Sequence, residues 1–237
     1  MMDRPTLKKD AKSILNSHFQ FYFLLWLPVF ILEIIGGFLY APDVRDGDAF
    51  TASQDIGLFI TLLAAIMAIG IYYVSIDAIR QTLQYDKPLQ KSFTVFARGE
   101  YFLGTILLYI LIFIFTFLWS LLLVIPGIIK GIAYSQAYYI YRDAIDQDKP
   151  ISYLEAITRS RELMNGHKWE YFVMSLSFIG WLLVVLITAG IATIWVQPYM
   201  VLSFANFYNE LIEQSADQDN QPTIETTGPT NSSDSDQ

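Results

Sequence analysis

The chain has 237 residues, of which 54% are hydrophobic, 16% are aromatic and only 16% are charged. A soluble globular domain carries about 25% charged residues, so this composition excludes an ordinary water-coated surface and favours an integral membrane protein. The net charge of −8 argues against a nucleic-acid-binding protein, which needs clustered Lys and Arg to neutralise phosphates. Cysteine is absent, which excludes disulfides, thiolate metal sites and a cysteine nucleophile.

Six apolar stretches are predicted to span the membrane. A spanning helix needs about 20 mostly apolar residues, because it must cross the hydrocarbon core with its backbone groups hydrogen-bonded internally. The third and fourth stretches meet at Pro126 and Gly127, and the fifth and sixth meet at Ala189 and Gly190, so each pair is predicted to form a tight hairpin. The predicted fold is all-α, a polytopic transmembrane helical bundle with spans over residues 19–40, 56–83, 101–125, 126–141, 169–188 and 191–212.

The Lys and Arg residues predict the orientation, because positively charged loops stay on the cytoplasmic side. With six spans and a cytoplasmic N-terminus, 13 of the 15 cations lie on the inner side, and Arg45 and Lys130 lie on the outer side. Residues 214–237 contain no aromatic residue, Lys or Arg, and such a polar segment is expected to be disordered. We therefore predict a membrane domain over residues 1–213, an acidic cytoplasmic tail over residues 214–237, and both termini in the cytoplasm.

An internal repeat divides the membrane domain. Residues 72–81 align with residues 138–147 at an offset of 66, with six of ten positions identical, and residues 86–89 resemble residues 148–151. Both copies lie where a predicted span leaves the membrane on the cytoplasmic side. We therefore predict three hairpin units, related by an axis along the membrane normal, over about residues 1–83, 84–147 and 148–213.

A short amphipathic cytoplasmic helix is predicted before each hairpin. Residues 6–15 place apolar side chains opposite lysines, and Ser152 with Glu155 forms a capping box at the start of another such helix. A basic amphipathic helix attracts anionic lipid headgroups by roughly 1 kcal/mol per cation. An anchoring collar is the favoured interpretation and a specific lipid sensor the alternative. The interfacial cations are Lys8, Lys9, Lys12, Arg159, Arg161 and Lys168.

Ionisable and polar residues within the spans are candidate functional groups, because a charge inside the membrane is costly. Glu33 and Lys130 lie at similar predicted depths, and three interpretations stay open: a structural ion pair, independent snorkelling toward the outer interface, or a transport or proton site. Gln197, beside Pro198, and Asn206 are expected either to hydrogen-bond carbonyls freed by a kink or to line a passage.

Other residues fit structural roles better than chemical ones. Asp77 and Asp143 occupy equivalent repeat positions and are interpreted as boundary acids that bond a neighbouring unit. Small residues allow two helix backbones to approach closely, and Gly127, Gly131 and Ser135 form such a face on the fourth span. The two histidines form at most a weak metal site, so no metal or cofactor is predicted. No P-loop, nucleophile elbow or other catalytic motif occurs, and we predict that the protein is not an enzyme.

Three sequence segments resemble a known family. They are residues 119–130 (WSLLLVIPGIIK), residues 154–169 (LEAITRSRELMNGHKW) and residues 176–181 (LSFIGW). Together they resemble the bacterial membrane family called domain of unknown function 975, over about residues 7–211. A fainter likeness extends to the membrane domain that precedes some glycerophosphodiester phosphodiesterases, and it implies no hydrolase activity. The resemblance implies a bacterial cell membrane and supplies no reaction or ligand residues.

The sequence therefore predicts a non-enzymatic integral membrane protein with a membrane-organising or accessory role. The alternative is a small-molecule or ion transporter or channel whose path runs near Glu33, Lys130 and Gln197. An intramembrane enzyme acting on lipid is a third interpretation and lacks a catalytic set. The predicted partners are the bilayer and its anionic headgroups. A protein partner or a homo-oligomer is left open.

Overall fold

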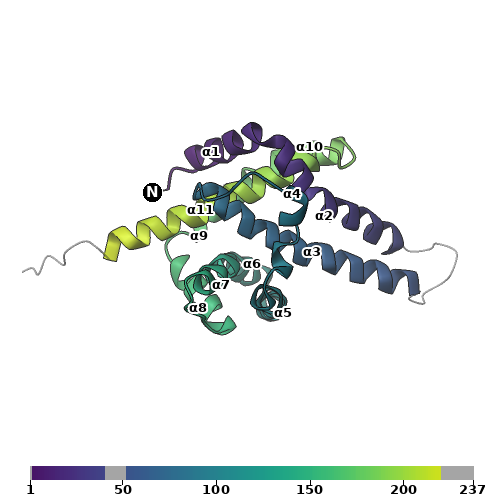
Figure 1. The fold of residues 1–237 in the computed structure, drawn as a ribbon. Helices are drawn as coiled ribbons and strands as arrows, with labels where there is room; N and C mark the ends of the chain where they lie inside the picture. The colour runs from purple at the N-terminus through teal and green to yellow at the C-terminus, as the bar shows by residue number, and fades with distance from the viewer. Residues whose placement is uncertain (1, 41–51, 220–237) are drawn as a thin grey trace, which may run out of the picture.

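The fold is known from a computed structural model that describes residues 2–40 and 52–219. These residues form helices joined by short loops, with no β-strand among them (Figure 1). The predicted all-α class is therefore confirmed. Residues 220–237 of the predicted tail lie outside the described residues, whereas residues 214–219, also predicted to be disordered, continue the last helix.

Four helical segments are long and apolar enough to cross a membrane, and they correspond to the first, second, third and fifth predicted spans. The fifth consists of two consecutive helices. The predicted fourth span is divided into two helices at Ser135 and Gln136. The predicted sixth span, except for its first two residues, lies within a 27-residue helix that contains Pro198. The elements are α1 Arg4–Ser17, α2 Phe19–Tyr40, α3 Ala52–Ile79, α4 Pro88–Lys91, η1 Thr94–Phe96, α5 Gly99–Leu122, α6 Val124–Tyr134, α7 Ala137–Asp146, α8 Tyr153–Leu163, α9 Lys168–Leu176, α10 Ile179–Ile187 and α11 Thr193–Asp219.

In the first hairpin, α2–α3, two glycines allow the two helices to pack closely near the connection between them. A Cβ added at Gly57 would lie 2.5 Å from the backbone nitrogen of Tyr40 and 2.8 Å from the carbonyl oxygen of Gly36. The two helix backbones therefore touch at this point, which only residues without a side chain allow. Thr61 Oγ1 donates a hydrogen bond to the Gly57 carbonyl oxygen at 3.0 Å in the next turn of α3.

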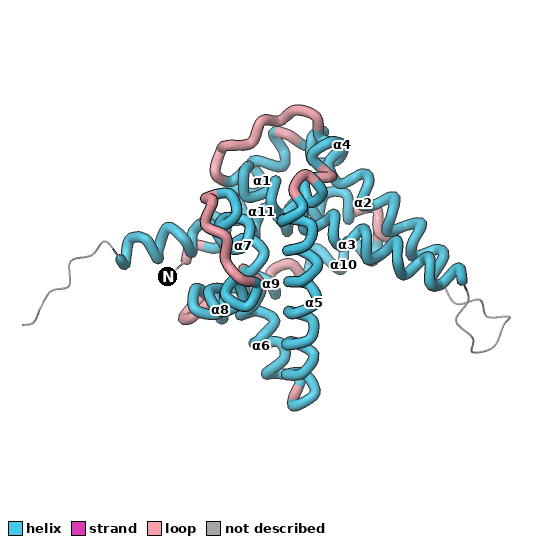
Figure 2. Tube along the Cα trace, turned by 60° about the horizontal axis from the view of Figure 1, so that its bottom comes forward, coloured by secondary structure: helices cyan, strands magenta, loops and turns pink. Residues whose placement is uncertain are grey.

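The helices converge at one end of the molecule, which we call the base. Its core contains the side chains of Tyr22, Trp26, Tyr73 and Tyr208, all at most 1% exposed. From the base the α2–α3 and α5–α6 hairpins point in different directions, as Figure 2 shows. We call these two hairpins and α10–α11 the three arms. Large apolar side chains near the ends of the arms are exposed: Ile34, Phe38, Leu121, Leu122, Ile125, Leu186, Ile187 and Ile191.

The helices that precede the hairpins differ between the units. The first and third units have the helices α1 and α8, of 14 and 11 residues, where the sequence predicts them, whereas the second unit has only the four-residue α4 and the 3-10 turn η1. The apolar face of α1, with Leu7, Ala11 and Leu15, is buried against the protein core, because α1 lies along α11 (Figure 1). These three side chains of the predicted amphipathic helix therefore contact protein, whereas Lys9 and Lys12 are exposed.

Candidate functional site

Two ion pairs join the base of the first hairpin to α7 in a reciprocal arrangement. Arg80, just after α3, donates to both carboxylate oxygens of Asp143 in α7, at 2.8 and 2.7 Å. In the opposite sense, Arg142 Nη2 of α7 lies 2.6 Å from Asp77 Oδ1 of α3. Asp77 and Asp143 occupy equivalent positions of the predicted repeat, so each of these acids bonds an arginine from the other unit. The interpretation of both residues as boundary acids agrees with this geometry.

The ion pairs extend into a wider network that reaches α5 and α11. Asp146 forms ion pairs with Arg142 Nε at 2.8 Å and with Arg98 at 3.6 Å, and it accepts a hydrogen bond from the Tyr101 hydroxyl. The Tyr208 hydroxyl of α11 donates to Asp143 Oδ2 at 2.8 Å. Helices from all three predicted units therefore meet in one charged cluster.

The cluster keeps Arg142 charged. Burial lowers the pKa of Arg142, but the negative charges of Asp77 and Asp146 outweigh it and leave this pKa raised. The side chain of Arg142 is only 11% exposed. Its Nε and Nη1 atoms are buried and form no hydrogen bond, so Arg142 depends on its ion pairs with Asp77 and Asp146, and removing either acid would be costly.

A polar cleft of about 1240 Å³ opens beside this network, between α7, α8 and α11. The cleft is lined by three cations and three acids. It therefore offers charged hydrogen-bond donors to anionic groups and charged acceptors to cationic groups. These charged residues are Arg80, Lys149, Arg159, Asp143, Glu155 and Glu162. Across one wall of the cleft, Arg159 Nη2 donates to Glu155 Oε1 at 2.7 Å, one helical turn away.

Glu33 and Lys130 do not form the predicted ion pair. No ion pair in the described part of the chain joins them, and the Lys130 ammonium instead lies 4.4 Å from the centroid of the Trp119 ring, a cation–π contact. The Glu33 side chain is exposed on α2. Of the three interpretations, the geometry disfavours the structural pair and leaves snorkelling and a transport site open.

The two polar candidate residues of α11, Gln197 and Asn206, have different surroundings. Asn206 Nδ2 donates to the Leu7 carbonyl oxygen at 3.2 Å, so it fixes α1 on α11 rather than bonding a carbonyl freed by the Pro198 kink. Gln197 is partly buried one residue before that proline. The two residues are therefore not brought together with Glu33 and Lys130 in one described cavity.

The predicted interfacial cations fall into bound and exposed groups. Lys8 Nζ donates to Ser177 Oγ at 2.8 Å and lies 4.1 Å from the Phe178 ring centroid, and burial lowers its pKa. Lys12 Nζ lies 5.8 Å from the Trp195 ring centroid. Lys9, Lys12, Arg159 and Arg161 have exposed side chains, and Lys168 is partly buried at the start of α9. Lys8 is therefore a packing residue that joins α1 to α9 and α11.

The three residues of the predicted small-residue face of α6 also differ in their contacts. A Cβ at Gly127 would lie 2.1 Å from Ser120 Oγ and 3.0 Å from Ser120 Cα, so this position allows α5 and α6 to approach each other. A Cβ at Gly131 would make only an ordinary contact, 3.7 Å from the Thr116 methyl carbon. Ser135 Oγ bonds its own helix at the Ile132 carbonyl oxygen.

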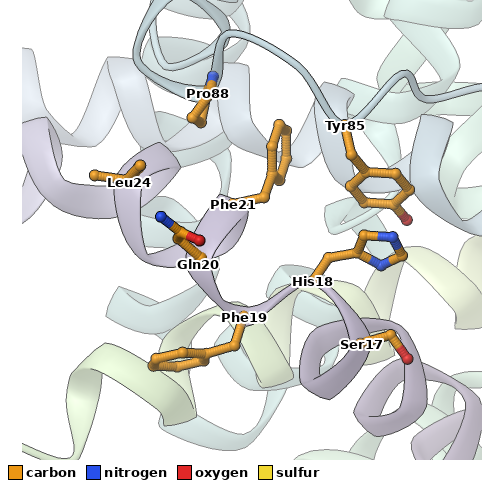
Figure 3. Close-up of a pocket in the computed structure, with 8 residues that line it drawn as sticks. All are labelled: Ser17, His18, Phe19, Gln20, Phe21, Leu24, Tyr85 and Pro88. Carbon is orange, nitrogen blue, oxygen red and sulfur yellow. The ribbon is translucent and has the colours of Figure 1, made fainter.

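The two histidines lie apart and each contacts other groups. His18 stacks on Tyr85 with 3.5 Å between the ring centroids and lines a pocket of about 380 Å³ (Figure 3). His167 Nδ1 lies 2.9 Å from Glu170 Oε2. No group of three or more potential metal ligands occurs in the described residues.

Sequence analysis missed the partners of the boundary acids and one buried serine. Arg142 follows directly from the repeat alignment, where it occupies the position of Ile76, and this exchange of an apolar residue for a cation is a signal for pairing across units. Ser160 of α8 donates to the Ala133 carbonyl oxygen at 2.8 Å and accepts from the Gln136 backbone nitrogen at 3.2 Å. It completes the hydrogen bonds at the break between α6 and α7, and no local pattern in the sequence indicates this role.

Comparison with known proteins identifies part of the chain. Residues 120–215 match a family model described as "Protein of unknown function (DUF975)". The match confirms the family resemblance. The DUF975 region includes every lining residue of the charged cleft except Arg80, whereas Asp77 and Arg80 precede it. No curated protein and no solved structure matches the chain.

Proposed function

We propose that this protein is a multi-pass protein of the bacterial cell membrane with a non-enzymatic, membrane-organising or accessory role. In this proposal the chain crosses the membrane six times in three hairpins, with the base and both termini on the cytoplasmic side. Residues 126–141, within consecutive α6 and α7, form the fourth span, and residues 191–212, mostly within α11, form the sixth. The excess of Lys and Arg in the segments assigned to the inner side supports this orientation.

The reciprocal ion pairs of the base are the observation that carries the proposed role. They join α3 and α7 through charged groups, while the arms keep apolar side chains exposed. A protein that is fixed at one membrane face and open along its apolar arms can hold lipids or other membrane helices between the arms. In this proposal the ion pairs of the base hold the arms in their relative positions, and they do not act on a substrate.

Cysteine labelling tests the proposed topology, because the chain contains no cysteine and any single substitution gives a unique thiol. Leu123→Cys lies between α5 and α6, and Ser13→Cys lies on α1. We expect a membrane-impermeant maleimide to label Leu123→Cys in intact cells and Ser13→Cys only after the membrane is opened. Labelling of Ser13→Cys in intact cells would overturn the orientation.

Reconstitution tests the role. We expect liposomes that contain the purified full-length protein to stay as tight to protons and small ions as empty liposomes, because the proposed protein organises the membrane without conducting. An ion flux that depends on the protein and disappears in Glu33→Gln would replace this proposal with the transporter interpretation.

Transport is the second candidate function, and one observation favours it. Glu33 carries an ionisable group in the middle of the apolar helix α2, and intramembrane carboxyl groups are usually functional. A path near Glu33, Lys130 and Gln197 would need these groups to face one water-filled space. The contact of Lys130 with Trp119 directs that cation toward α5 instead.

A further inference from the structure

The outer face of the α4–η1 segment combines an apolar groove with a cationic depression. The groove, of about 430 Å³, lies between this segment and the middle of α2 and α3, and Pro28, Ile31 and Met67 are among its lining residues. The depression, of about 580 Å³, lies on the polar side of the same segment and includes Lys87 and Lys91. Both volumes fall within the range of ligand pockets, about 300–1,000 Å³.

Two phenylalanines connect the groove to the depression. Phe93 and Phe96 line both, and their side chains are 48% and 41% exposed. Leu89 of α4, 49% exposed, adds to the apolar wall. The surface therefore changes from hydrocarbon to cationic over one short segment, which is the chemistry of an amphiphile with a negative headgroup.

The α4–η1 segment is fixed firmly enough to form a wall. Ser92 Oγ donates to the Leu25 carbonyl oxygen of α2 at 2.6 Å, and this contact is buried. Val95 is fully buried against α3, where a Cβ added at Gly70 would lie 2.9 Å from the Val95 backbone nitrogen. Because these two contacts hold the inner side of the segment, the exposure of its outer apolar side chains is a property of the fold.

The charges of the depression favour an anion. Lys91 pairs with the exposed carboxylate of Asp86, whereas the Lys87 ammonium forms no ion pair and donates no hydrogen bond in the described part of the chain. Asp86 also lines the depression, so its two lysines exceed its acid by one charge. One phosphate with a single negative charge matches this excess.

We propose that the α4–η1 surface binds one anionic diacyl phospholipid, with an acyl chain in the groove along α2 and α3 and the phosphate at Lys87. The proposal rests on the proposed orientation, which puts the depression at the inner leaflet surface and the groove in its hydrocarbon. It assigns lipid recognition to the segment that precedes the second hairpin, which holds none of the predicted interfacial cations. In this proposal the cationic depression binds the lipid headgroup, and the apolar groove separately binds the acyl chain.

Native mass spectrometry of the full-length protein in detergent tests the proposal with phosphatidylglycerol and phosphatidylcholine of identical acyl chains. We expect one phosphatidylglycerol molecule to stay bound more tightly than phosphatidylcholine. Lys87→Gln with Lys91→Gln should weaken phosphatidylglycerol binding about thirtyfold, because each of the two cations near an anionic headgroup contributes about 1 kcal/mol. Leu89→Gln, at an exposed position that does not endanger folding, should weaken the binding of both lipids.

Lys9→Gln with Lys12→Gln is the matched control, since it removes the same charge from α1. An equal loss of binding in this control, or equal binding of the two lipids by the unchanged protein, would overturn the proposal. A dimer that dissociates in Leu89→Gln while no lipid stays bound would also overturn it and assign the groove to a second copy. These results do not depend on membrane orientation, so they are separate from the outcome of the labelling experiment.

Discussion

The α2–α3 and α5–α6 hairpins have similar apolar composition and very different surroundings. In the most apolar window of each helix, 28% of α2 and 44% of α3 are buried within the protein, against 11% of α5. The α4–η1 segment and α11 cover the first hairpin, whereas α5–α6 joins the rest of the protein mainly at the base. The difference shows that apolar content determines whether a helix can enter the membrane, whereas the neighbours of that helix determine how much of it lipid must cover.

The largest expected effect comes from breaking the base that both hairpins share. Asp143→Ala removes the acceptor of Arg80 and Tyr208 and leaves the partly buried Arg80 cation without its ion-pair partner, which should lower the free energy of unfolding by about 3 kcal/mol. Unfolding of the detergent-solubilised protein in increasing dodecyl sulfate measures the change. If Asp143→Ala is equally costly when Arg80 is already alanine, the two side chains are not coupled.

A second substitution distinguishes the packed hairpin from the exposed one. Gly57→Ala forces a methyl group against the backbone of α2 and should destabilise the protein by about 1–3 kcal/mol, the usual cost of overpacking. Gly131→Ala in the α5–α6 hairpin, where a methyl group meets only an ordinary contact, is the matched control and should be neutral or slightly stabilising. Thermal unfolding midpoints of the two variants measure the contrast, and equal midpoints would contradict it.

A smaller effect is expected where α1 joins the third arm. Lys8→Ala removes the hydrogen bond to Ser177 and the cation–π contact with Phe178, at a cost of about 1 kcal/mol. The same unfolding measurement applied to Lys9→Ala, an exposed lysine one position further along α1, should show no change. A loss in both variants would mean that α1 is held by its overall charge and not by this contact.

The smallest effect is expected on the surface of α8. Glu155 and Arg159 form an exposed ion pair one turn apart, with side chains 44% and 53% exposed, and such pairs contribute about 0.3–0.5 kcal/mol. Arg159→Ala should therefore change the unfolding midpoint very little. A drop as large as that of Asp143→Ala would show that the charged cleft, and not the base network alone, supports the fold.

Much of the fold could be predicted from the sequence, because long apolar runs and helix-breaking pairs are local signals. Phe19–Tyr40 is found with the same bounds, and the capping serine Ser152 accepts from the Glu155 nitrogen at 3.1 Å as expected. Each of these features is decided within a few residues of chain.

Features that depend on distant partners could not be predicted from those local signals. The similar depths of Glu33 and Lys130 leave an ion pair as one of three interpretations. Depth does not say which faces the two helices turn toward each other, and Lys130 contacts the Trp119 ring instead. The apolar stripe of α1 is correct, yet lipid and α11 are both apolar surfaces that such a stripe fits. The charges of Asp77 and Asp143 likewise indicate an interface between units, but they do not show which arginines lie across it.

The hydroxyl of Ser160 gives α8 a mechanical connection to the interior. Because it bonds backbone groups on both sides of the α6–α7 break, α8 and the two ends of that break are held by one side chain. A displacement of α8 relative to α6 and α7 would therefore strain both hydrogen bonds at the point where this helical run is already discontinuous.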